Sequence, residues 1–86
     1  MLAGHMDVPL GRRQIISQAL ARHIKLTRAE KGCLRFDVTK DAYVDGRFNV
    51  VEVFDSDAAF AAHQRRIALS DWAEVTKGCM RYYFKA

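Results

Sequence analysis

The chain has 86 residues, of which half are hydrophobic and only one is proline, so we expect one compact domain over residues 1–86 rather than a disordered chain. Its net charge of +4 includes two separate pairs, Arg12-Arg13 and Arg65-Arg66, with no aromatic residues interleaved, and this pattern argues against a nucleic-acid partner. No apolar run approaches the roughly 20 residues that cross a bilayer, and the first residues lack the features of a signal peptide. We therefore expect a cytoplasmic protein with no membrane partner.

The two cysteines, Cys33 and Cys79, are not spaced as a metal-binding knuckle. In a cytoplasmic protein they should be reduced, and a small buried apolar role fits both of them. The sequence thus predicts free thiols and no metal site.

The first half of the chain reads as a strand, a long helix and a second strand. Residues 2–8 form a short strand that ends at the proline. Residues 11–30 form a helix, because their apolar positions recur with helical spacing. Residues 33–40 alternate Leu34, Phe36 and Val38 with polar residues, which is typical of a half-buried strand. The apolar stripe of the helix contains Ile15, Ile16, Ala19, Leu20 and Ile24.

The second half reads as a strand, two helical segments and a final strand. Asp45-Gly46 provides hairpin turn chemistry before a strand over residues 47–54. Ser56 or Asp55 can cap a helix that runs through His63 to about Arg66, and Ser70 or Asp71 can cap a short helical turn around Trp72. Residues 79–85 alternate again and form the last strand.

The order βαββαβ predicts a ferredoxin-like α+β fold, with an antiparallel sheet and both helices on one face. The opposite face would be only half apolar, which is too apolar to stay fully in water. We therefore expect a homodimer that packs these faces together. The residues expected on this face are Arg35, Asn49, Val51, Val53, Arg81 and Tyr83.

Two titratable residues stand in apolar rows that should face each other. Strand parity places Glu52 on the same face as Phe48, Val50 and Phe54. Helical spacing places His63 on a stripe with Phe60 and Ile67. An acid from the sheet and a histidine from its covering helix would share a pocket and act as an acid/base pair. A histidine on an apolar stripe is also typical of a hydrogen-bonded core residue, and Glu52 is also a natural partner for an arginine.

Further residues are candidates for the walls of this pocket. Trp72 and Phe60 are candidate substrate contacts, and both also suit a plain hydrophobic core. Tyr82 and Tyr83 point to opposite sides of the last strand, and we take Tyr82 as the one that contacts the substrate. His23 lies among polar neighbours and is expected to have no functional role.

Three segments of the sequence resemble the antibiotic biosynthesis monooxygenase domain family: residues 30–38 (EKGCLRFDV), 45–54 (DGRFNVVEVF) and 57–64 (DAAFAAHQ). The resemblance implies a dimeric α/β barrel in which each subunit holds a pocket between sheet and helices. Known members include quinol or polyketide monooxygenases that use no metal or flavin, haem-degrading enzymes and an isomerase. Ala68 and Leu69 stand where many members have a second histidine and an aromatic residue, and residues 2–8 lack the asparagine of the haem-degrading members.

The residues and the resemblance lead to three functional hypotheses. The first is a cofactor-independent monooxygenase that oxidises a small aromatic, a quinol or a phenol with O2, using His63 as the base. The second is an isomerase or tautomerase of a small keto compound that uses His63 and Glu52. The third is a small-molecule binding module without turnover.

Overall fold

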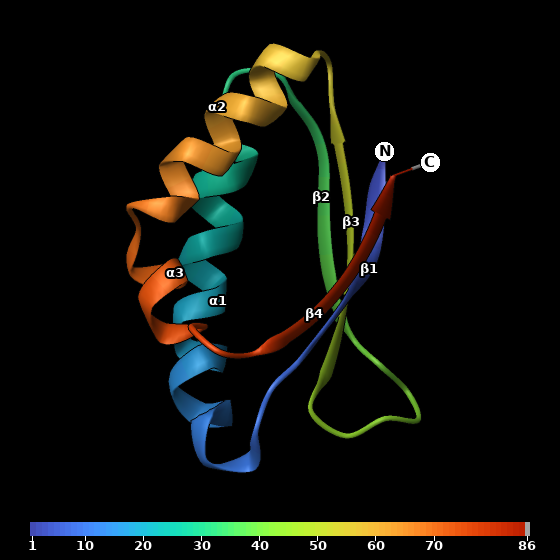
Figure 1. The fold of residues 1–86 in the computed structure, drawn as a ribbon, viewed down its shortest axis with the longest axis vertical. Coiled ribbons are helices and arrows are strands. Elements are labelled where there is room, and N and C mark those ends of the chain that lie inside the picture. The colour runs from blue at the N-terminus through green and yellow to red at the C-terminus, as the bar shows by residue number, and fades with distance from the viewer. Residues whose placement is uncertain (86) are drawn as a thin grey trace.

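The computed structural model describes residues 1–85 and has the predicted βαββαβ order. The four strands form one antiparallel sheet in the order β2-β3-β1-β4, which confirms the ferredoxin-like α+β fold. Figure 1 shows the helices together on one face of the sheet, and the first and last strands side by side, with Leu2 paired to Lys85. The elements are β1 (Leu2–Asp7), the 3-10 helix η1 (Leu10–Arg12), α1 (Arg13–Arg28), β2 (Cys33–Lys40), β3 (Arg47–Phe54), α2 (Asp57–Ala68), α3 (Asp71–Val75) and β4 (Met80–Lys85).

Local sequence signals account for most of the element ends. The side chain of Ser56 accepts a hydrogen bond from the Ala59 amide and caps α2, and Ser70 caps α3 in the same way. Gly46 has a φ of +80° in the turn before β3, a conformation that glycine adopts without strain. These are the caps and the turn that the sequence predicts.

The central strand β3 gives the sheet its two faces. Its residues Phe48, Val50 and Glu52 are buried beneath the helices, as the alternation predicts. The core next to this strand contains Met6, Val8, Ile16, Phe48 and Cys79. Both cysteines are free, and only Cys79 is fully buried. No helix within residues 1–85 is long and apolar enough to cross a membrane.

The side chains of the last strand, β4, lie on the opposite faces of the sheet from those that we predicted. Its register on β1 pairs Arg81 with Met6 and Tyr83 with Gly4. Directly paired residues in an antiparallel sheet point to the same side, and Met6 is buried in the core, so Arg81 and Tyr83 lie on the helix-covered face. Tyr82 therefore lies on the outer face. The prediction failed because both faces of this strand carry large apolar groups, and alternation alone does not say which is inside.

Two smaller differences have local causes. A register shift between Cys33 and Arg35 leaves Leu34 exposed, although alternation placed it inside with Phe36. On α1, Ile15 is exposed, and the buried positions are Ile16, His23 and Thr27. The buried stripe of this helix is thus more polar than the sequence indicated.

Candidate active site

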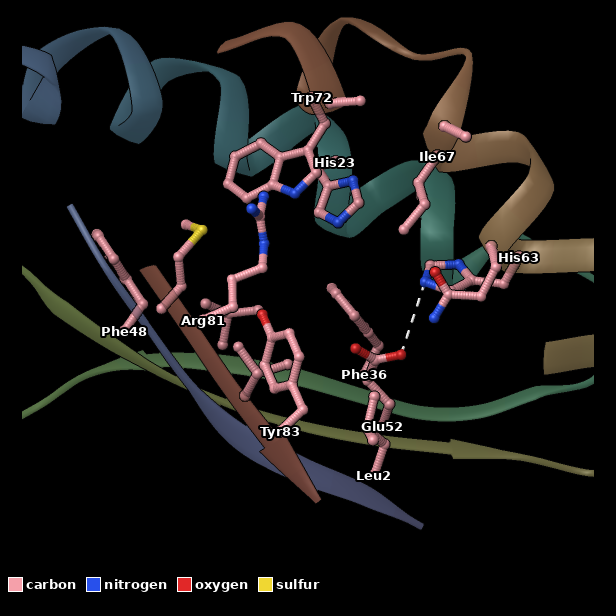
Figure 2. Close-up of a pocket in the computed structure, with 16 residues that line it drawn as sticks. Leu2, His23, Phe36, Phe48, Glu52, His63, Ile67, Trp72, Arg81 and Tyr83 are labelled. Carbon is pink, nitrogen blue, oxygen red and sulfur yellow. Dashed lines mark ion pairs between the residues drawn. The ribbon is translucent and has the colours of Figure 1, made fainter. Parts of the chain in front are cut away.

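A cavity of about 460 Å³ lies between the sheet and the helices. Figure 2 shows side chains from the strands below and from the helices above pointing into it. All four strands and the helices α1, α2 and α3 contribute to its walls. Its size matches the usual volume of small-molecule pockets. The side chains that matter for chemistry are His23, Glu52, His63, Trp72, Arg81 and Tyr83.

His63 and Glu52 share this cavity, as the two periodicities predict. The His63 side chain is 1% exposed, and its Nε2 lies 3.6 Å from Oε1 of Glu52. The short Ala-rich helix α2 turns His63 toward the sheet, while the parity of β3 turns Glu52 toward the helix. The dashed line in Figure 2 marks this ion pair.

Glu30 is a third member of the site, and the sequence patterns did not indicate it. Its Oε1 lies 2.6 Å from Nδ1 of His63, and its Oε2 lies 3.1 Å from Nε of Arg66. A carboxylate only accepts hydrogen bonds, so Nδ1 of His63 carries the proton and donates it to Glu30. This leaves the lone pair of a neutral His63 on Nε2, the nitrogen that faces Glu52.

Glu52 is held in an unusual state for a carboxyl group. It is 7% exposed, and its Oε1 has no hydrogen-bond partner within residues 1–85. Burial, and then the charge of Glu30, raise the pKa of Glu52 to about 7. Near neutral pH the Glu52 carboxyl therefore changes readily between its two protonation states beside Nε2 of His63, so the pair can take up and return a proton.

His23 and Trp72 form another part of the cavity wall. Their rings are stacked with centroids 4.4 Å apart, and His23 is 6% exposed. Burial, followed by the charges of Arg66 and His63, lowers the pKa of His23 to about 4, so its imidazole is neutral at pH 7. The prediction that His23 lies among polar neighbours is therefore wrong. Its helical spacing from Ile16 and Leu20 was the signal that it faces the core.

The remaining predicted site residues lie outside this cavity. Phe60 is at the edge of a second cavity of about 350 Å³, which also reaches Glu52, and its ring centroid is 6.4 Å from that of His63. Tyr82 lies on the outer face of the sheet, where its ring packs 5.1 Å from His5. Tyr83, on the same strand, lines the main cavity instead.

The comparisons with known proteins agree with this fold. The family model described as antibiotic biosynthesis monooxygenase matches residues 1–75. A candidate antibiotic biosynthesis monooxygenase from Bacteriodes thetaiotaomicron superposes with a TM-score of 0.86 at 17% identity, covering 99% of this chain and 84% of that one. One from Nitrosomonas europaea gives 0.80 at 17% identity, covering 99% and 95% of the two chains.

A third similar structure, from Deinococcus radiodurans, has a TM-score of 0.73 at 22% identity and covers 100% of this chain and 92% of that chain. At such identities the structural likeness shows the fold alone. No curated protein matches the sequence. The family model, which spans most of the chain, gives the assignment: this protein belongs to the antibiotic biosynthesis monooxygenase family.

Proposed function

We propose that the protein is a cofactor-independent monooxygenase that oxidises a small aromatic substrate, a quinol or a phenol, with O2. The observation that carries this proposal is the position of His63, whose Nδ1 is held by Glu30 at 2.6 Å while Nε2 faces the cavity beside Glu52. Such an imidazole, whose side chain is 1% exposed, is an oriented general base. Family membership supports the same reaction class.

The reaction begins with proton transfer from the substrate. His63 removes the phenolic proton through Nε2, and the resulting anion is electron-rich enough to react with O2 by transferring one electron. The two radicals combine to a ring hydroperoxide, which loses water and leaves a carbonyl. Overall, one phenol and one O2 give one quinone and one water, because one oxygen atom enters the ring and the other leaves with the phenolic hydrogen and a ring hydrogen. The substrate supplies all the electrons that reduce O2, so this reaction requires no metal or flavin.

Glu52 completes the proton movements in this proposal. One proton must return to the hydroperoxide so that water can leave, and a carboxyl group with a pKa of about 7 is suited to deliver it at neutral pH. Trp72 would pack against the substrate ring as part of the cavity wall. Phe60 would shield His63 from the side of the second cavity. We propose no substrate contact for Tyr82, and we expect the active species to be a cytoplasmic homodimer.

A second candidate function is an isomerase or tautomerase of a small keto compound. The observation that favours it is that Nε2 of His63 on α2 and Oε1 of Glu52 on β3, two proton carriers, lie 3.6 Å apart. One of them would remove a proton from carbon while the other protonates an oxygen. This reaction would use the same residues but no O2.

Oxygen uptake separates these possibilities. The purified protein would be incubated with a panel of quinols, phenols and small ketones, with and without air, while dissolved oxygen and products are followed. We expect one O2 consumed per quinone formed, and no product without air. Product formation that is equal with and without air would reject the monooxygenase in favour of the isomerase. Ligand binding with no product under either condition would indicate a binding module.

A further inference from the structure

A guanidinium group stands in the wall of the main cavity and is not used by the proposed proton transfers. Arg81 extends from β4 toward Trp72, away from His63 in Figure 2. Most of the cavity lining is apolar, and the solvent-exposed Arg81 adds to it a permanent positive charge that could pair with a carboxylate of the protein. The hydrogen bonds of Arg81 show whether the protein provides one.

Arg81 donates only to neutral oxygens. Its acceptors are the carbonyls of Thr76 and Cys79 and the hydroxyl of Thr76. Within residues 1–85, no carboxylate forms an ion pair with Arg81. These contacts hold the guanidinium in place without neutralising it, which leaves its charge for a bound molecule.

Tyr83 adds a hydrogen-bond donor beside this charge. Its side chain lines the cavity together with Arg81. Burial raises the pKa of the Tyr83 hydroxyl, and the opposing effect of the Arg81 charge does not cancel it. The hydroxyl therefore keeps its proton at neutral pH and can donate it in a hydrogen bond to an anionic oxygen.

His23 adds a polar atom without adding charge. Its Nδ1 is buried and has no hydrogen-bond partner within residues 1–85, and its low pKa keeps the ring neutral. Arg81 is therefore the cationic side chain that lines this part of the cavity, while the charge of Arg66 acts on His23 from outside the lining. Glu30 behind His63, and Glu52 whenever its carboxyl has lost its proton, place negative charge in the other part. The cavity is therefore polarised from Arg81 to Glu52.

We propose that the cavity selects aromatic substrates that carry a carboxylate, which binds Arg81 and Tyr83 while the phenolic oxygen lies at His63 and Glu52. This rests on the proposed function for the identity of the reacting end. A carboxylate in the reverse orientation would meet Glu52 and be repelled, so the charge pattern sets both the substrate class and the direction of binding. The arginine fork matches the two oxygens of a carboxylate.

The test uses two ligands of the same shape, 6-hydroxy-2-naphthoate and its neutral amide, titrated by calorimetry under argon. We expect the wild type to bind the carboxylate about 10-fold to 100-fold more tightly, which is the usual range for a hydrogen bond to a charged group. Arg81→Met should bind the two ligands equally, and Arg81→Lys should keep part of the preference. Arg65→Met, which changes an exposed arginine on α2, should behave as the wild type.

Two further measurements show where the carboxylate binds and test the proposal without relying on the Arg81→Met variant. Trp72 is the only tryptophan, so its single indole N–H signal in an NMR spectrum should shift on binding. Added salt should weaken carboxylate binding and leave the amide unchanged, even if Arg81→Met does not fold. Equal affinities in the wild type, a preference that survives in Arg81→Met, or no binding of the carboxylate would overturn the proposal. Because no turnover is needed, a failure to consume oxygen would reject the proposed reaction but not this subsite.

Discussion

The two ring nitrogens of His63 meet two carboxyl groups that differ in their surroundings. Glu30 also contacts Arg66 and accepts a hydrogen bond from Nδ1, whereas Glu52 is buried without a hydrogen bond to its Oε1. The first carboxyl orients the imidazole, and the second can exchange a proton with it. We propose that one histidine between two unlike acids serves here as the proton-transfer site.

The raised pKa of Glu52 predicts a pH-dependent change in stability. Between its ordinary pKa of 4.5 and about 7, folded Glu52 holds a proton that the unfolded chain has released, so the free energy of unfolding falls as pH rises. Glu52→Gln has no carboxyl to ionise, so it does not lose this stability as pH rises. We expect the variant to be more stable than the wild type by up to about 3 kcal/mol at pH 8, and equal to it near pH 4.

Urea denaturation at both pH values measures this difference. The matched control is Glu74→Gln on α3, an exposed glutamate that should change stability by less than about 0.5 kcal/mol. A Glu52→Gln variant that is less stable at pH 8 would show that the charged carboxylate is favoured inside the folded protein. Glu52 would then not be the readily protonated acid of this site.

The connection from α1 to β2 sets the position of Glu30. Gly32 has a φ of +87°, and a Cβ there would lie 2.6 Å from both Asp55 Oδ1 and Ala59 Cβ. This close approach is between the α1–β2 connection, which contains Glu30, and the start of α2, the helix that carries His63. The turn is thus part of the active-site geometry as well as of the fold.

The close contacts of Gly32 predict that Gly32→Ala lowers stability more than a glycine substitution that adds backbone strain alone. We expect Gly32→Ala to destabilise the protein by about 2–4 kcal/mol, from strain together with displaced contacts. Gly78→Ala is the control, because its φ of +84° is similar but no atom lies within 4 Å of the added Cβ. It should cost only about 1 kcal/mol. Equal losses of stability in chemical denaturation would show that the close contact of Gly32 with the start of α2 has no effect.

Elements with strong local signals could be predicted from the sequence. Serine caps, a glycine turn and the alternation of β3 depend on residues that are close together in the chain. These signals predicted β3, α2 and the approach of Glu52 to His63. The partners of His23 and Glu30 are long-range, since Glu30 lies 33 residues before His63. Local patterns do not report such contacts. The prediction of which β4 side chains face the helices was wrong for a related reason, because only the register of β4 on β1 decides it.

At the scale of the whole molecule, the outer face of the sheet carries several exposed apolar side chains. Met80, Tyr82 and Phe84 on β4 are 59%, 53% and 63% exposed and lie on this side. Val51 and Val53 of β3 extend the same face. The face is more apolar than the sequence indicated, because Tyr82 and Phe84 replace Arg81 and Tyr83 on it. Burial against a second copy would remove this apolar area from water.

We therefore predict a homodimer in solution, with a mass twice the 9.8 kDa of one chain by light scattering at micromolar concentration. Phe84→Glu should shift it toward the monomer, because it places a charge in the apolar face. Tyr43→Glu should not, since Tyr43 is 97% exposed in the β2–β3 connection. A monomeric wild type, or equal effects of the two substitutions, would reject this interface.

We propose above that His63 is the base of an oxygen-consuming reaction. The most direct test compares oxygen uptake by the wild type and by His63→Ala with the same phenolic substrate at pH 7.5. We predict that the variant keeps its fold and oligomeric state but loses about 100-fold to 10,000-fold in rate, the usual contribution of a general base. An unchanged rate of oxygen uptake in His63→Ala would contradict this claim.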